Sequence, residues 1–92
     1  MDASLERELI ALLERARQGD RKAYGTFFDL TIEATLASVQ ALVPGDRVEA
    51  ALTQVYETAW RALPAYSGDM QSASAWLDGI CREVARGAGG GK

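Results

Sequence analysis

Residues 21–43 read RKAYGTFFDLTIEATLASVQALV, and this stretch decides the fold. Its larger apolar residues recur every three or four positions over about six turns, which is the period of an α-helix with one buried face. The members of this stripe are Tyr24, Phe27, Phe28, Ile32, Leu36, Val39 and Val43. Gly25 and the β-branched Thr26 and Thr31 weaken the helix locally, so we expect a bend between residues 25 and 31. The stretch predicts a long central core helix.

A helix-to-helix corner precedes this stretch. Gly19 fits the left-handed position that ends a helix, and Asp20 is placed to cap the next helix through its carboxylate. The segment before the corner, from Leu5 to about Ala16, carries leucines at helical spacing with charged residues between them. These features predict a short leading helix that ends at the Gly-Asp pair.

A second corner, Pro44-Gly45-Asp46, follows the central stretch. Proline and glycine do not continue a helix comfortably, and Asp46 with Glu49 matches a capping box. A third helix is therefore predicted from Arg47 to about Leu63. Its expected apolar face comprises Val48, Leu52, Val55, Tyr56, Ala59 and Leu63.

The remaining chain predicts a loop and one more helix. Residues 64–71 contain turn formers and no apolar period, so we expect a surface loop. Ser72 can cap a fourth helix, which should end near Arg86 because the glycines that follow favour disorder. The sequence therefore predicts an all-α fold, a compact bundle of four helices over residues 1–86, with a flexible glycine-rich tail over residues 87–92.

Composition limits the possible functions. The chain has 92 residues, which suits one domain, and its net charge of −3 gives no broad positive field for holding duplex DNA. No apolar run approaches the ~20 residues that span a bilayer, and the first residues do not resemble a secretion signal. We therefore expect a cytoplasmic protein with no membrane partner, which needs help from a partner or a local patch if it contacts DNA.

Catalytic and metal-binding chemistry lack their usual side chains. The sequence contains no histidine and a single cysteine, Cys81, so neither a disulfide within the chain nor a zinc or iron–sulfur ligand set can form. The acidic residues are spread over helix surfaces and do not converge at marked spacings. We expect no enzyme activity, no cofactor and no metal site, and we interpret Cys81 as a small apolar core residue.

Several residues in fixed order resemble a known module. They are Gly19-Asp20, Ala23-Tyr24, Phe28, Thr31, Tyr56, Trp60 and the run Ser72-Ala73-Ser74-Ala75-Trp76-Leu77. In this order and spacing they resemble region 2 of the extracytoplasmic-function group of bacterial RNA polymerase sigma factors. The resemblance covers residues 5–86. It implies a domain that docks on RNA polymerase core and recognises and melts the promoter −10 element during transcription initiation.

The resemblance implies a polymerase-binding surface on the third helix. In the family this helix docks on the clamp helices of the largest polymerase subunit. The corresponding residues here are Glu49, Thr53, Gln54, Glu57 and Arg61. Thr53-Gln54 occupies the place of a family Gln-Glu pair, and Ala50 that of a frequently acidic residue, so part of the polar docking surface is altered.

The resemblance also implies a DNA-binding site in the loop and the fourth helix. In the family the loop captures a base flipped out of single-stranded −10 DNA, and a pocket of backbone groups and apolar walls suits an unpaired base. The implied residues are Tyr66, Ser67, Gly68, Asp69, Met70, Gln71, Ser72, Trp76, Arg82 and Arg86.

Other interpretations stay open. One alternative keeps the fold and makes the chain a degenerate sigma-like domain that binds an anti-sigma factor or another regulator, which the altered docking positions favour. A second alternative is a plain helical interaction module, as a monomer or a dimer. Taken singly, Tyr24, Phe28, Tyr56 and Trp60 suit core aromatics, and Trp76 suits a packing anchor. Arg82 and Arg86 also oppose the helix dipole favourably, without any DNA.

Overall fold

The computed structural model describes the backbone of residues 3–67 and 71–90. Within these residues the chain forms four α-helices and two short 3₁₀ helices, which confirms the all-α fold predicted from the sequence. The α-helices are α1 (Ala3–Arg17), α2 (Arg21–Leu42), α3 (Val48–Ala62) and α4 (Ala73–Gly90). The 3₁₀ helices are η1 (Gly45–Arg47) and η2 (Leu63–Ala65).

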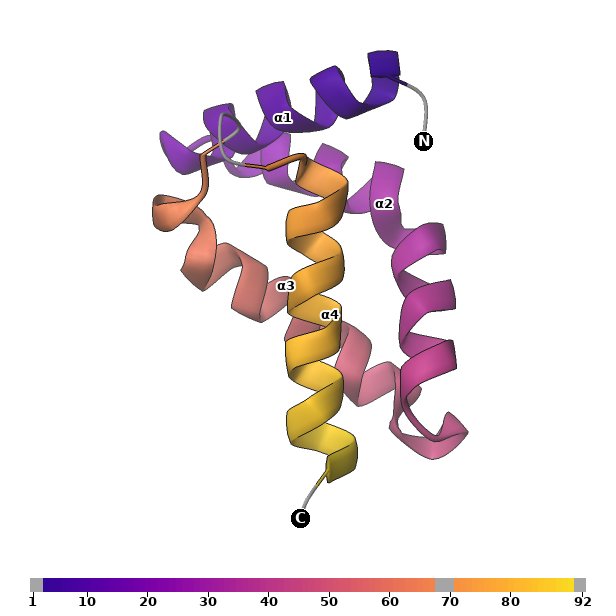
Figure 1. The fold of residues 1–92 in the computed structure, drawn as a ribbon. Coiled ribbons are helices and arrows are strands. Elements are labelled where there is room, and N and C mark those ends of the chain that lie inside the picture. The colour runs from indigo at the N-terminus through magenta and orange to yellow at the C-terminus, as the bar shows by residue number, and fades with distance from the viewer. Residues whose placement is uncertain (1–2, 68–70, 91–92) are drawn as a thin grey trace.

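The long helix α2 joins the two parts of the bundle. In Figure 1 its first part lies beneath α1, and the rest turns away to run along one side of α4. The turn falls where the sequence predicted a bend. The hydroxyl of Thr31 donates to the carbonyl of Phe27 at 2.8 Å, a bond back to the preceding turn that bends helices. Helix α3 crosses behind α4, and α1 contacts both η2 and α4.

The corner between α1 and α2 has the predicted geometry. Gly19 has a φ of 104°, which favours glycine because a Cβ is strained there. The Asp20 carboxylate accepts a hydrogen bond from the Ala23 amide at 3.1 Å and faces the Arg15 guanidinium at 3.2 Å. The bond from Ala23, assisted by Arg15, lowers the pKa of Asp20. Local cap signals therefore position the first two helices.

The buried face of α2 differs from the predicted stripe. Its buried residues are Ala23, Phe27, Thr31, Thr35 and Val39. The prediction placed Phe28 inside, but its side chain is 38% exposed. Two threonines occupy the middle of the buried face because their hydroxyl groups have buried hydrogen-bond partners across the helix interface.

The start of α3 agrees with the prediction to within one residue, but its predicted capping box and the predicted end of α4 are wrong. Helix α3 is preceded by η1, in which the Arg47 amide donates to the Pro44 carbonyl at 2.9 Å, and no capping box forms between Asp46 and Glu49. A 3₁₀ turn closed by a backbone hydrogen bond therefore precedes α3 in place of the predicted side-chain cap. Helix α4 continues past Arg86 to Gly90, because extending an existing helix adds a hydrogen bond for each residue. Of the predicted tail, residues 87–90 are helical and residues 91–92 lie outside the described part.

All four helices contribute to one core. Its largest fully buried side chains are Phe27, Leu9, Leu13, Val39, Val55 and Cys81. The apolar face predicted for α3 largely holds, since Val55, Tyr56, Ala59 and Leu63 are buried, although it also includes Ala51. Among the described residues, no helix combines the length and apolarity needed to cross a membrane.

Candidate functional site

The exposed face of α3 carries all the residues implied in polymerase binding. Glu49, Thr53, Gln54, Glu57 and Arg61 are each exposed. Four of them are spaced by four residues, so they follow one another along a single helix face. The opposite face of α3 packs on α2 and α4. The structure therefore brings these five side chains together on one accessible surface.

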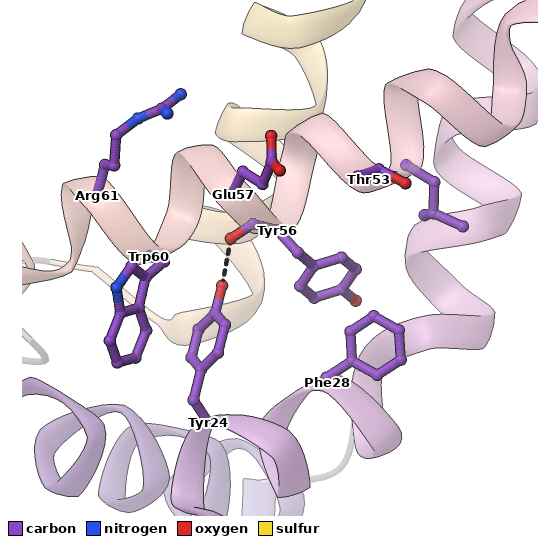
Figure 2. Close-up of a pocket in the computed structure, with 8 residues that line it drawn as sticks. Tyr24, Phe28, Thr53, Tyr56, Glu57, Trp60 and Arg61 are labelled. Atoms are coloured by element: carbon purple, nitrogen blue, oxygen red, sulfur yellow. Dashed lines mark hydrogen bonds between the residues drawn. The ribbon is translucent and has the colours of Figure 1, made fainter. Parts of the chain in front are cut away.

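An aromatic groove adjoins this surface, between α2 and α3. Its volume is about 580 Å³. The residues that line it are Tyr24, Phe28, Leu52, Thr53, Tyr56, Glu57, Trp60 and Arg61. Figure 2 shows Tyr24 and Phe28 rising from α2 toward the α3 side chains, with Glu57 and Arg61 at the opposite rim. The groove thus has an apolar floor and a charged edge.

Ring contacts and one hydrogen bond fix the walls of the groove. The Tyr24 hydroxyl donates to the Tyr56 carbonyl at 2.6 Å, as Figure 2 shows. The Tyr24 and Trp60 ring centroids lie 4.9 Å apart in an edge-on arrangement, and those of Phe28 and Tyr56 lie 4.6 Å apart. Phe28 and Trp60 are each 38% exposed. Interpreting all four aromatics as core residues is therefore wrong for these two, which reach the surface.

A buried polar cluster lies behind the groove. The Tyr56 hydroxyl lies 2.8 Å from the Thr31 hydroxyl and donates to the Thr35 hydroxyl at 3.0 Å. Burial raises the pKa of Tyr56, and the two threonine hydroxyls partly offset this shift. Sequence reasoning assigned Tyr56 to the core but missed its polar partners, because threonine at a buried helix position has no distinctive sequence signal.

The residues at the base of the implied DNA loop are buried. Tyr66 is 2% exposed and Trp76 is 8% exposed, and their ring centroids lie 4.9 Å apart. The Tyr66 hydroxyl donates to the Gln71 carbonyl at 3.3 Å. In the unbound chain these two aromatics pack in the core and are not on the surface, because they anchor the loop and the start of α4.

The remaining loop residues vary in accessibility. Gln71 is exposed, and Ser67 and Ser72 are half-buried. Ser72 caps α4 as predicted, because its hydroxyl accepts from the Ala75 amide at 3.1 Å. Gly68, Asp69 and Met70 lie outside the described residues. Among the described residues of this segment, the accessible groups are therefore polar, and the aromatic groups are buried beneath them.

Glu6 on α1 holds the first turn of α4. Its carboxylate accepts hydrogen bonds from the Ser74 hydroxyl at 2.5 Å, from the Ser74 amide at 3.3 Å and from the Ala73 amide. Burial raises the pKa of Tyr66, and the charges of Glu6 and Glu14 add to the shift. Sequence reasoning missed this contact, since nothing local indicates a partner 67 residues away.

The two implied DNA-binding arginines lie on one exposed face of α4. Arg82 and Arg86 are four residues apart and both exposed. The Arg82 guanidinium lies 3.1 Å from the Asp78 carboxylate, and both side chains are largely solvated. Such surface pairs are weak, so Arg82 can exchange this partner for a phosphate.

The described part of the chain offers no metal centre. No group of three His, Cys, Asp or Glu side chains there is arranged to hold a metal ion. Cys81 is buried, and burial raises its pKa to about 11. A thiol with so high a pKa is neutral near pH 7, as expected for a core residue.

Comparison with solved structures identifies the class of this domain. An NMR structure of an engineered region 2 of sigmaE, in complex with GTAAAA, superposes with a TM-score of 0.80 at 25% sequence identity. The match covers 96% of this chain and 90% of that chain. A scan of known protein families and a comparison with curated protein sequences give no match. The chain is therefore a sigma region 2-like domain, as its sequence pattern predicted.

Proposed function

We propose that this domain docks on RNA polymerase core and recognises the promoter −10 element as single-stranded DNA, without a chemical step of its own. The observation that carries the proposal is the fold shared over 96% of the chain with a sigma region 2 that binds GTAAAA. The exposed face of α3 provides the polymerase-docking surface. The loop before α4 provides the pocket for a displaced base.

The net charge of the chain supports separate roles for polymerase docking and for base binding. With a net charge of −3, the chain cannot rely on phosphate attraction to hold duplex DNA. Polymerase would supply that grip, and the domain would supply a local pocket for one base together with Arg82 and Arg86 for nearby phosphates. These two arginines lie on α4, the same helix whose start follows the loop.

The proposal is tested by measuring two interactions separately. The chain should co-elute with purified polymerase core, and a crosslinkable −10 strand should attach to it in that complex. Glu57→Arg should weaken core binding about tenfold by reversing a charge at the centre of the α3 face, while binding of free single-stranded DNA stays unchanged.

The matched control is Glu8→Arg, the same charge reversal at an exposed position on α1. Equal core binding by the two variants would mean that α3 is not the docking face. Failure of the unmodified chain to bind core at all would overturn polymerase docking.

A second candidate function is favoured by the aromatic groove. A degenerate sigma-like domain would use the exposed Phe28 and Trp60 to bind an anti-sigma factor or another regulatory protein in place of polymerase. Association with such a regulator in the absence of any core binding would select this function over the first.

A further inference from the structure

Each backbone amide in the first turn of α4 has a hydrogen-bond acceptor. The first amides of a helix have no partner within the helix and need other acceptors. Glu6 accepts from the amides of Ala73 and Ser74, and Ser72 accepts from that of Ala75. The Trp76 amide then makes the first regular bond, to the Ser72 carbonyl at 3.0 Å. A distant carboxylate and a local hydroxyl therefore share the capping of this helix.

The carboxylate of Glu6 also ties two separate parts of the molecule together. It belongs to α1, whereas Ser74 begins α4 and follows the loop directly. Charge-assisted bonds to a helix start are stronger than neutral ones and are favoured by the helix dipole. The other end of the loop is held by Tyr66, which is buried against Trp76. The described residues on either side of positions 68–70 are therefore each held by contacts with the core.

We propose that Glu6 is a positioning residue for single-stranded DNA binding, which fixes the exit of the loop without contacting the nucleotide. The inference rests on the proposed function, because it assumes that this loop holds the base. Glu6 acts through the amides of Ala73 and Ser74, which set where the first turn of α4 begins. Its effect on binding comes from preorganising the first turn of α4.

Two physical effects of removing Glu6 have opposite signs. A carboxylate near a DNA site repels phosphates, so charge alone predicts that a neutral residue tightens binding. Loss of positioning predicts weaker binding, because the first turn of α4 must then be ordered when DNA binds. The sign of the change therefore separates a positioning residue from a bystander charge.

The experiment measures the Kd for fluorescently labelled single-stranded GTAAAA with the full chain. Glu6→Ala should weaken binding about tenfold and Glu6→Gln about threefold, since the glutamine carbonyl still accepts one of the bonds. Glu8→Gln removes the same charge from an exposed position on the same helix. This control should bind within about twofold of the unmodified chain.

Amide hydrogen exchange in the absence of DNA provides the second readout. The amides of Ala73 and Ser74 should exchange faster in Glu6→Gln than in Glu8→Gln, at a temperature where circular dichroism shows both variants folded. If Glu6→Ala does not fold, Glu6→Gln carries the same test. Unchanged or tighter binding by the Glu6 variants overturns the inference. Absence of GTAAAA binding by the unmodified chain, both alone and in complex with polymerase core, overturns the proposed function and the inference with it.

Discussion

Two tyrosine–tryptophan pairs in this domain have the same separation but different surroundings. The ring centroids of Tyr66 and Trp76, and those of Tyr24 and Trp60, both lie 4.9 Å apart. Trp76 is 8% exposed, whereas Trp60 is 38% exposed. Ring contact alone therefore does not decide whether an aromatic pair supports the core or forms part of a surface.

The two pairs also share a hydrogen-bonding pattern. The Tyr24 hydroxyl donates to the Tyr56 carbonyl at 2.6 Å, and the Tyr66 hydroxyl donates to the Gln71 carbonyl at 3.3 Å. The first bond joins two helices, and the second closes the loop. One pair thus lines a groove on the surface, whereas the other forms a buried base for the segment before α4.

Replacing each tryptophan tests this difference and has the largest expected effect. Trp76→Ala should lower the free energy of unfolding by about 3–5 kcal/mol, because it empties a buried site. Trp60→Ala should cost about 1–2 kcal/mol, since much of its ring already meets water. Urea denaturation of both variants measures the two values.

A milder pair of variants guards against unfolding. Trp76→Phe and Trp60→Phe keep an aromatic ring, so each should cost less than the corresponding alanine variant while preserving their order. Equal losses at the two positions would contradict the distinction between a buried support and a surface pair.

The hydroxyl groups behind the groove give the next largest effect. Tyr56→Phe should cost about 1–2 kcal/mol, because it leaves the buried Thr35 hydroxyl without its tyrosine partner. Tyr24→Phe should cost about 0.5–1 kcal/mol, since its hydroxyl is only part-buried. Chemical denaturation checks both.

A double variant sharpens this measurement. Adding Thr35→Val to Tyr56→Phe removes the unsatisfied hydroxyl, so part of the lost stability should return. Strictly additive losses would show that the two hydroxyl groups do not interact.

Alkaline pH should weaken both regions. Burial raises the pKa of Tyr24, Tyr56 and Tyr66 above the ordinary value of 10.0. The unfolded chain therefore loses these protons first, so the stability that the three tyrosines contribute is constant below about pH 10 and falls as the pH rises beyond it. Circular dichroism with tyrosinate absorbance should show unfolding and ionisation together.

Phenylalanine variants assign this alkaline loss to one region or the other. Tyr24→Phe should make the free energy of unfolding fall less steeply with pH by removing the contribution of the groove. Tyr66→Phe should do the same by removing the contribution of the tyrosine beneath the loop. A profile that neither variant changes would place the responsible groups elsewhere.

Local signals explain what the sequence could predict. Some features depend only on backbone groups within three residues, so the residue types at those positions are enough to predict them. The corner at Gly19 and Asp20 and the helix cap at Ser72 are of this kind. The four helices follow from apolar period in the same way. The exposed positions on α3, such as Glu57, were predictable because one helix face must pack on its neighbours.

Contacts between distant segments explain what the sequence could not predict. Glu6 meets Ser74 across 68 residues, and a lone glutamate on a charged helix gives no hint of it. The burial of Thr31 and Thr35 depends on the Tyr56 hydroxyl of another helix. Likewise, only the packed structure distinguishes the exposure of Trp60 from that of Trp76.

Thiol labelling compares the buried core with the surface beside the loop, and it requires the smallest change in stability of the experiments proposed. Cys81 is 2% exposed, and its burial raises its pKa to about 11, so labelling needs both opening of the structure and ionisation. Gln71→Cys, in a Cys81→Ala background, places a thiol at an exposed position beside the loop. At pH 8 the loop thiol should react roughly a hundredfold faster or more than Cys81. In urea the two rates should converge, because unfolding removes the burial.

Rapid labelling of Cys81 in the folded chain would instead mean that the core behind the groove opens as readily as the loop. The contrast between a buried support and an accessible surface would then be lost.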